Sequence, residues 1–422
     1  MTPLHIRSSQ LEAHFEKYCS CCLIESTVIQ LSNSLLLFVI VYLTLFLAIS
    51  KALNRSIAKM AAQPPPNLKI PSSQATVRVR IIDTTSQIEG IPLEPFVQPH
   101  IKGHDTIKCP AFSFLIEHPS SRSILFDLGV KKNPLETYSP RIVDRIKSGG
   151  WKVTVEKDVR EQLEENGVKG ESIEAIIWSH WHWDHTGDPS TFPSSTTLIV
   201  GPGFKERFVP AYPTNKDSPI KESDYEGREL REISFLGGLK IGRFDAFDYF
   251  GDGSFYLLDS PGHAVGHMCG LARVSSNPDS FILMGGDACH HGGEFRPSPY
   301  LPLPESIFPS PLHLSYTTPC PGLLFEPLLR DGDKTKPFYG IANLPDGKGV
   351  AENVEEAEDT VAKVMEADAH AEVLVAMAHD ETLVGVVDFF PEYADGFLGK
   401  EWVEKSRWLF LRDFKDAIGP EM

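Results

Sequence analysis

The 422-residue sequence predicts one folded domain of the layered α/β class. Short apolar runs bounded by Gly, Pro, Asp or Asn recur along the chain, as is typical of buried strands. Amphipathic helical patterns lie between and after these runs, and no internal repeat is present. The hydrophobic content of 41 % allows a sizeable core. These observations together favour sheets covered by helices.

The first 75 residues differ from the rest of the chain. Residues 1–25 form a mixed N-terminal tail, and residues 26–50 lack any charged side chain over a length that can cross a bilayer as a helix. Because a mixed tail precedes the apolar run, an anchor is favoured over a cleavable signal peptide. Residues 51–75 become rich in Pro and Ser and predict an extended linker. The folded domain is therefore expected to span residues 76–422.

Two forms of the protein remain open. Translation from Met1 gives a chain anchored to a membrane through residues 26–50, whereas a start near Met60 gives a cytoplasmic protein without the anchor. The orientation of the anchor is also open, since a cysteine cluster before the span favours a cytosolic N-terminus if it is palmitoylated. Three cations after the span favour a cytosolic C-terminal side instead: Lys51, Arg55 and Lys59.

The strands of the domain are predicted from apolar runs between turn residues. Most of these runs lack polar alternation, so burial on both faces is expected. The predicted strands lie at 77–82, 112–116, 124–126, 173–178, 197–200, 255–258, 269–274, 281–284 and 373–376.

Three segments predict helices that cover a sheet. Residues 155–166 place apolar side chains at every fourth position, and Gly167 is typical of a helix C-cap. Residues 354–367 carry apolar side chains on one face and acids on the other, and residues 401–417 form an apolar-rich tail helix. By contrast, residues 296–345 are Pro-rich and weakly periodic, which indicates an inserted loop region near a site.

Charge and cysteine usage exclude several classes of function. The chain has 40 Lys and Arg against 57 Asp and Glu, a net charge of -17 that repels phosphate backbones. No basic strip for a nucleic acid is evident, so a small-molecule substrate is expected. The seven cysteines show no even spacing, and three of them cluster at residues 19–22, which argues against a zinc ribbon or a disulfide framework. Nothing in the sequence indicates an oligomeric state.

Residues 179–188, SHWHWDHTGD, gather three histidines and an aspartate within six positions. In extended chain, residues two apart point the same way, so His180 and His182 can face one metal ion. A turn after His182 displaces Asp184 and His185 along the edge, where they can serve a second ion. The tryptophans between these residues point elsewhere and are expected to pack. The spacing suits two metals.

Three other apolar runs each end in one potential ligand. FYLLDSPGH ends at His263, SFILMGGD ends at Asp287, and EVLVAMAH ends at His379. A carboxylate has two oxygens and can bridge two cations, so Asp287 is the natural group between two sites. The side chains are rich in imidazole, and zinc is the first choice among divalent ions, although iron or manganese fits similar ligands.

The HxHxDH spacing and the three later residues resemble the metallo-β-lactamase superfamily. The resemblance implies that one metal is held by His180, His182 and His263, and the other by Asp184, His185 and His379. Asp287 matches the bridging aspartate of the family, and Asp127 in ILFDLG matches an early strand-turn. The implied fold is a four-layer αββα sandwich with two divalent metal ions, most simply Zn²⁺, at one edge.

Ligand spacing looks closest to the lactonase-like and fungal lactamase-like branch. The implied activity is opening of a cyclic ester or amide by attack of a metal-bound hydroxide, in detoxification or secondary metabolism. Asp184 or His290 would deliver a proton to the leaving atom, and His290 stands where the lactonases carry a tyrosine. The same ligands also suit the alternative of a thioester hydrolase, of the glyoxalase II or acyl-carrier-protein type.

Overall fold

The computed structural model describes residues 62–313, 318–345 and 347–419. The predicted tail and anchor, residues 1–25 and 26–50, lie outside the described residues, as does the first part of the linker. Among the helices that are described, none is long and apolar enough to cross a membrane.

The first of two large sheets has the strand order β1-β5-β6-β8-β9-β10. β1 and β5, and β5 and β6, are antiparallel, whereas β6, β8, β9 and β10 run parallel to one another. The strand bounds are β1 Arg78–Asp83, β5 Phe112–His118, β6 Arg122–Phe126, β8 Ile173–Ile177, β9 Thr197–Val200 and β10 Leu230–Glu232.

The second sheet has the order β11-β12-β13-β14-β15-β19. It is antiparallel up to β15, which pairs in parallel with β19. The strand bounds are β11 Lys240–Ile241, β12 Phe244–Asp248, β13 Phe255–Asp259, β14 Met268–Ser276, β15 Asp279–Met284 and β19 Val373–Ala376. All nine predicted strands are present within two residues of their expected ends.

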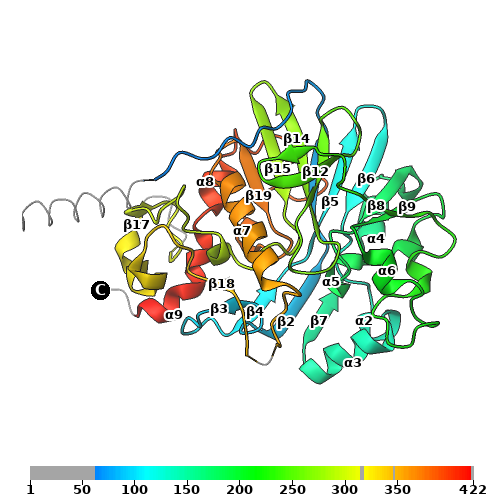
Figure 1. Ribbon diagram of the computed structural model, residues 1–422, viewed down its shortest axis with the longest axis horizontal. Coiled ribbons are helices and arrows are strands. Elements are labelled where there is room, and N and C mark those ends of the chain that lie inside the picture. The colour runs from blue at the N-terminus through cyan, green and yellow to red at the C-terminus, as the bar shows by residue number, and fades with distance from the viewer. Residues whose placement is uncertain (1–61, 314–317, 346, 420–422) are drawn as a thin grey trace, which may run out of the picture. The chain divides into compact units, whose positions relative to one another are not determined.

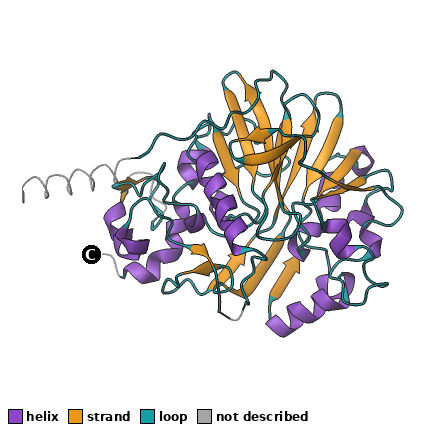
Figure 2. Cartoon of the chain, viewed as in Figure 1, coloured by secondary structure: helices purple, strands orange, loops and turns teal. Residues whose placement is uncertain are grey.

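The two sheets face each other and are covered by helices on their outer sides (Figures 1 and 2). Side chains from both sheets, such as Phe114 and Phe255, form one buried core. The outer face of the first sheet packs against α4 (Val159–Glu165) and α6 (Phe204–Phe208). The outer face of the second packs against α7 (Val354–Asp368). Alternate strand residues thus serve different cores, and the predicted four-layer αββα sandwich is confirmed.

Smaller elements surround one end of the sandwich, and most of them share a fourth apolar core. Their strands are β2 Ser86–Pro92, β3 Val97–Gln98, β4 Thr106–Cys109, β7 Lys152–Val155, β16 Ser306–Ile307, β17 Cys320–Pro321 and β18 Gly340–Ile341. Their helices are α2 Pro134–Thr137, α3 Pro140–Gly149, α5 Trp183–Thr186, α8 Trp402–Ser406 and α9 Lys415–Ile418, with 3₁₀ turns that include η5 Gly322–Leu328 and η8 Leu409–Phe414. The Pro-rich segment 296–345 is built mainly of such short pieces.

Three predicted boundaries need correction. The helix expected over 155–166 begins only at Val159, because Asp158 and Glu161 form a capping box and Val155 belongs to β7. The tail helix expected over 401–417 is broken into α8, η8 and α9. The second part of the linker is extended, but it lies against the domain, where Leu68 is buried in the core beneath α7.

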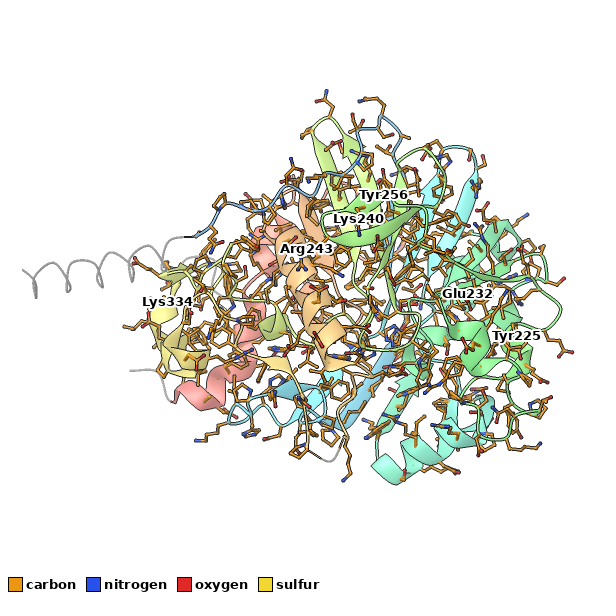
Figure 3. The ribbon with its side chains drawn as sticks, viewed as in Figure 1. Tyr225, Glu232, Lys240, Arg243, Tyr256 and Lys334 are labelled. Carbon is orange, nitrogen blue, oxygen red and sulfur yellow. The ribbon has the colours of Figure 1, made fainter. Side chains whose placement is uncertain are left out.

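Ion pairs fasten the long helix α7 to the second sheet. Arg243, beside β12, lies over this helix (Figure 3) and pairs with Asp359 and Glu366, two carboxylates on α7. Both contacts are partly exposed, so solvent weakens them and the apolar face of the helix supplies most of its attachment.

Candidate metal centre

Strand ends bring the predicted ligands to one edge of the sandwich. β13, β15 and β19 run parallel to one another, because β14 is antiparallel to both β13 and β15, and β15 is parallel to β19. His263, Asp287 and His379 follow the carboxyl ends of these strands within four residues. His180 and His182 follow β8 of the first sheet. Side chains from both sheets therefore meet where the strands end.

The chain turns immediately after His182, as the spacing of the motif requires. His182 is extended, with φ -65° and ψ 146°, and the short helix α5 begins at the next residue. This turn carries Asp184 and His185 away from the first pair. Trp183 is buried in the fourth core, whereas Trp181 packs on Phe208 and also lines a cavity above the centre.

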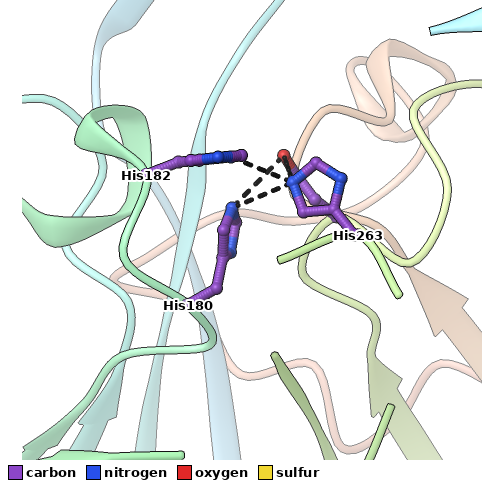
Figure 4. Close-up of side chains that lie close together, drawn as sticks. His180, His182 and His263 are labelled. Atoms are coloured by element: carbon purple, nitrogen blue, oxygen red, sulfur yellow. Dashed lines mark hydrogen bonds and ion pairs between the residues drawn. The ribbon is translucent and has the colours of Figure 1, made fainter. Parts of the chain in front are cut away.

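Three imidazoles and one carboxylate converge in the first group (Figure 4). His263 Nε2 lies 3.2 Å from His180 Nε2 and 2.9 Å from His182 Nδ1. Asp287 Oδ2 lies 3.7 Å from His180 Nε2 and 3.4 Å from His263 Nε2. These four side chains have the arrangement needed to hold a metal ion.

A second group lies on the other side of Asp287. Asp184, His185 and His379 are close enough to hold an ion together. Asp287 Oδ1 is 3.1 Å from both His185 Nε2 and His379 Nε2, and His379 Nε2 is 3.4 Å from Asp184 Oδ2. The two oxygens of Asp287 thus face different groups, which is the geometry of a bridging carboxylate.

The electrostatics of the centre fit divalent cations. Burial, reinforced by neighbouring histidines, holds the pKa of His180 and of His263 well below 6.5, so their imidazoles are neutral and present nitrogen lone pairs. Among the described residues, His185 Nε2 and Asp287 Oδ1 are buried without a hydrogen-bond partner. Converging lone pairs and unsatisfied acceptors repel each other unless a cation lies between them. Imidazole nitrogen and carboxylate oxygen are the donor set that zinc accepts.

Hydrogen bonds from outside the two groups orient their histidines. Asp127 Oδ1 accepts the backbone N–H of Ser179, and Oδ2 accepts from Ser179 Oγ and from His185 Nδ1 at 2.7 Å and 3.0 Å. His379 Nδ1 donates to the carbonyl of Pro110 at 2.6 Å. Both histidines consequently direct Nε2 into the centre. Asp127, which the family resemblance singled out, acts on the centre through these contacts.

His267 belongs to the same network and was not predicted. It is fully buried, and burial lowers its pKa to about 4, which keeps the ring neutral. Its Nδ1 donates to the carbonyl of Ser260, and its Nε2 accepts the backbone N–H of Asp287 at 3.0 Å. It therefore fixes the backbone that carries the bridging carboxylate. No motif links His267 to Asp287, so no sequence signal for this contact was available.

His290, the predicted proton donor, lies beside the centre. Its Nε2 is 3.3 Å from Asp287 Oδ2, and its ring packs edge-on against Phe96 with centroids 4.7 Å apart. In the described part of the chain, neither ring nitrogen has a hydrogen-bond partner although both are buried. Glu294 accepts the backbone N–H groups of His290 and His291 and so holds this loop in place.

A cavity of about 500 Å³ opens above both groups. Its floor contains Asp184, Asp287 and His290, and its walls include Phe96 and Trp151. Trp151 stacks on Trp183 with ring centroids 6.3 Å apart, which extends the aromatic wall to the metal-binding motif. The volume and the mixture of apolar walls with a polar floor are typical of a small-molecule site.

Several known proteins are similar in sequence to this chain. The model of the metallo-β-lactamase superfamily matches residues 106–317. A γ-lactamase of Fusarium pseudograminearum is 48 % identical over 357 residues, covering 83 % of this chain and 85 % of the relative. A metallo-hydrolase of Annulohypoxylon moriforme is 45 % identical over 364 residues, covering 84 % and 92 %. A γ-lactamase of Gibberella moniliformis is 54 % identical over 224 residues, covering 53 % and 93 %.

These matches agree with the geometry described above. The family match covers the strands of both large sheets except β1 and β19 and ends within the Pro-rich segment, so it contains the HxHxDH motif, His263 and Asp287. The first two relatives match this chain along most of their own length. The chain therefore belongs to the metallo-β-lactamase superfamily and is a hydrolase of that superfamily.

Proposed function

We propose that this protein is a dinuclear metallohydrolase that opens a cyclic ester or amide, a lactone or a lactam. His180, His182 and His263 would hold one divalent ion, and Asp184, His185 and His379 the other. The observation that carries the proposal is the placement of Asp287, whose two oxygens face the two groups separately.

Zinc is the ion we propose for both positions, since imidazole and carboxylate ligands predominate. When bound, two such cations would supply Lewis-acid polarisation of a carbonyl and would lower the pKa of water to near neutral pH. The chain provides the rest of the site. Its apolar walls bind the body of the substrate and exclude water, and its floor holds the reacting carbonyl beside Asp287.

The names of the relatives support the substrate class, since two of them are γ-lactamases. The cavity supports it as well, because about 500 Å³ accommodates a small ring with a modest substituent. We place the activity in detoxification or secondary metabolism on the basis of the same family resemblance. A thioester hydrolase would use the same ligands, so substrates have to separate the two activities.

A panel of substrates tests the proposal directly. Purified protein loaded with zinc is offered lactones, lactams and thioesters of matched size, with metal content measured on the same sample. We expect kcat/KM for at least one lactone or lactam to exceed that of every thioester by at least about tenfold, equivalent to about 1.4 kcal/mol. Preference for the thioesters would establish the alternative activity, and absence of bound metal would contradict the dinuclear centre.

His290 is proposed to deliver the proton that the departing oxygen or nitrogen requires. Asp184 is the other candidate, but it belongs to the proposed ligands, whereas His290 stands outside them and neither of its ring nitrogens has a hydrogen-bond partner within the described residues. His290→Gln is expected to lower kcat by about 10² to 10⁴. Steady-state kinetics checks this, with metal content unchanged.

His100→Gln is the matched control for this substitution. His100 is exposed and pairs with Asp105 at the surface, so its replacement should leave kcat unaltered. If His290→Gln retains the wild-type kcat, His290 is not the proton donor. If it loses metal instead, His290 is a ligand rather than a donor.

A further inference from the structure

Cationic side chains line the catalytic cavity, although the chain as a whole carries a net charge of -17. Outside the proposed metal ligands, the residues there with a full charge at neutral pH are four cations and one acid: Arg141, Arg145, Arg207, Lys348 and Glu352. Cations gathered in a cleft raise the local concentration of anions. The cavity of this acidic protein therefore favours an anionic ligand.

Two helices bring three of these cations together. Arg141 and Arg145 are four residues apart on α3, so they lie on the same face of that helix. Arg207 lies on α6 and shares with Arg141 a second hollow of about 140 Å³, which Trp181 also lines. Because Arg141, Arg207 and Trp181 line the large cavity as well, the small hollow adjoins it.

Contacts with the protein orient two of the arginines. The guanidinium carbon of Arg145 lies 5.6 Å from the centroid of the Trp151 ring, which is within the range of a cation–π contact. Arg141 Nη1 donates to the carbonyl of Asp217 at 2.7 Å. Each contact leaves further N–H donors of the guanidinium available to a ligand.

Several donors on these walls have no acceptor in the protein. Within the described residues, no ion pair joins Arg145 or Arg207 to a carboxylate, although Asp217 lines the small hollow. The indole N–H of Trp181 is also without an acceptor there. Both arginines are exposed, so a ligand oxyanion can replace their water and gain charge-assisted hydrogen bonds.

A carboxylate suits this set of groups better than a neutral polar substituent. Its two coplanar oxygens match the planar fork of a guanidinium, whereas a primary amide presents one oxygen and an NH₂ donor. The aromatic rings of Trp151 and Trp181 line the same cavity and suit a planar body that carries the carboxylate.

We propose that Arg141, Arg145 and Arg207 form a subsite for a carboxylate, so that the natural substrate is a lactone or lactam that carries an anionic substituent. The inference rests on the proposed function for the reaction, but not for the binding of the carboxylate. Holding this substituent at the arginines orients the body of the substrate within the cavity.

Ligand binding tests the subsite without turnover. Calorimetric titration of the zinc-loaded, full-length protein compares 2-naphthoate with 2-naphthamide, which are similar in size and contain no ring that hydrolysis can open. We expect the wild type to bind the carboxylate about tenfold more tightly than the amide, since each of two exposed guanidinium groups contributes about threefold. In Arg145→Gln/Arg207→Gln this preference should fall about tenfold.

The matched control is Lys147→Gln/Lys205→Gln. It removes two exposed cations from the same helices, α3 and α6, and neither lysine lines the cavity. Its preference for the carboxylate should equal that of the wild type. All four side chains are exposed, so both double variants are expected to fold.

Three results decide between the explanations. If the arginine variant keeps the wild-type preference, the carboxylate binds elsewhere, such as at the metal ions, and the inference is wrong. If the lysine variant loses the preference equally, net charge and not the subsite attracts the carboxylate, which also overturns the inference. If only the arginine variant loses it, the subsite stands, even where the substrate panel finds no hydrolysis of lactones or lactams and so rejects the proposed function.

Discussion

Replacing Asp287 with alanine is expected to lower kcat by about 10³ or more. The carboxylate is buried, and its two oxygens face the two ligand groups at 3.1 to 3.7 Å, so no other side chain can take its place. Losing the polarising cations removes several kcal/mol of transition-state stabilisation, and about 4 kcal/mol corresponds to about 10³ in rate. Steady-state kinetics and elemental analysis of the same sample check the loss of activity and of metal together.

Asp248→Ala is the control for this variant. Asp248 accepts the backbone N–H groups of Gly251 and Gly253 in the turn after β12, at the end of the sheet opposite the ligands. Its replacement removes a carboxylate that supports a turn but does not contact the centre. The value of kcat should therefore stay within about twofold of the wild type. If Asp287→Ala remains folded by circular dichroism and hydrolyses a lactone at the wild-type rate, the bridging role is wrong.

The sequence predicts three of the proposed ligands because each of them follows a buried strand. His263, Asp287 and His379 each follow an apolar run, and the strands formed by these runs are parallel to one another. Parallel strands end at the same edge, so ligands far apart in sequence meet there. The burial of the runs on both faces made them recognisable as strands without an alternating pattern.

Sequence patterns do not predict features that depend on contacts between distant segments. His267 accepts the backbone N–H of Asp287, and His104 lies beside Asp413, which is far from it in the sequence. Neither arrangement leaves a spacing signal, because the partners are joined only by the tertiary fold. A lone histidine in a sequence is more often structural than functional, so these positions could not be separated from His118 or His370.

The C-terminal tail shows how tertiary packing overrides a helical pattern. Its apolar residues are too closely spaced for one face of a helix, and Leu409, Phe410, Leu411 and Phe414 are all buried. The 3₁₀ turns of η8 let these side chains enter the core from several directions. In α4, by contrast, Asp158 and Glu161 marked the helix start in the sequence, and the apolar periodicity was extended one turn too far.

Asp368→Ala is expected to lower the free energy of unfolding by about 3 to 5 kcal/mol. Asp368 at the end of α7 is 2 % exposed and accepts two hydrogen bonds from the guanidinium of Arg296, at 2.8 Å and 2.7 Å. Arg296 is itself 4 % exposed and also donates to the carbonyl of Arg407. Removing the carboxylate leaves a buried cation without its counter-charge, and urea unfolding measures the cost.

Two further variants separate this buried pair from an ordinary ion pair. Lys240→Ala removes a contact with Asp245 in which both side chains are exposed to solvent, and should cost less than about 1 kcal/mol. Arg296→Met/Asp368→Leu removes both members of the buried pair and should be more stable than Asp368→Ala, because the Arg296 charge no longer lacks its partner, whereas Arg407, 3.9 Å from Asp368, loses that contact in both variants. A loss below about 1 kcal/mol in Asp368→Ala itself would show that water reaches Arg296.

The contribution of Asp368 to the free energy of unfolding should depend on pH. Burial opposes ionisation of Asp368, but Arg296 outweighs it and holds the pKa of the carboxyl below 3.8. A carboxyl whose pKa is lowered by folding stabilises the protein above its unfolded pKa, and this stabilisation is lost as the pH falls through the folded value. The difference in unfolding free energy between wild type and Asp368→Ala should therefore be constant from about pH 8 to pH 5 and shrink below about pH 4. A difference that instead grew on acidification would mean that Arg296 does not stabilise the ionised form of Asp368.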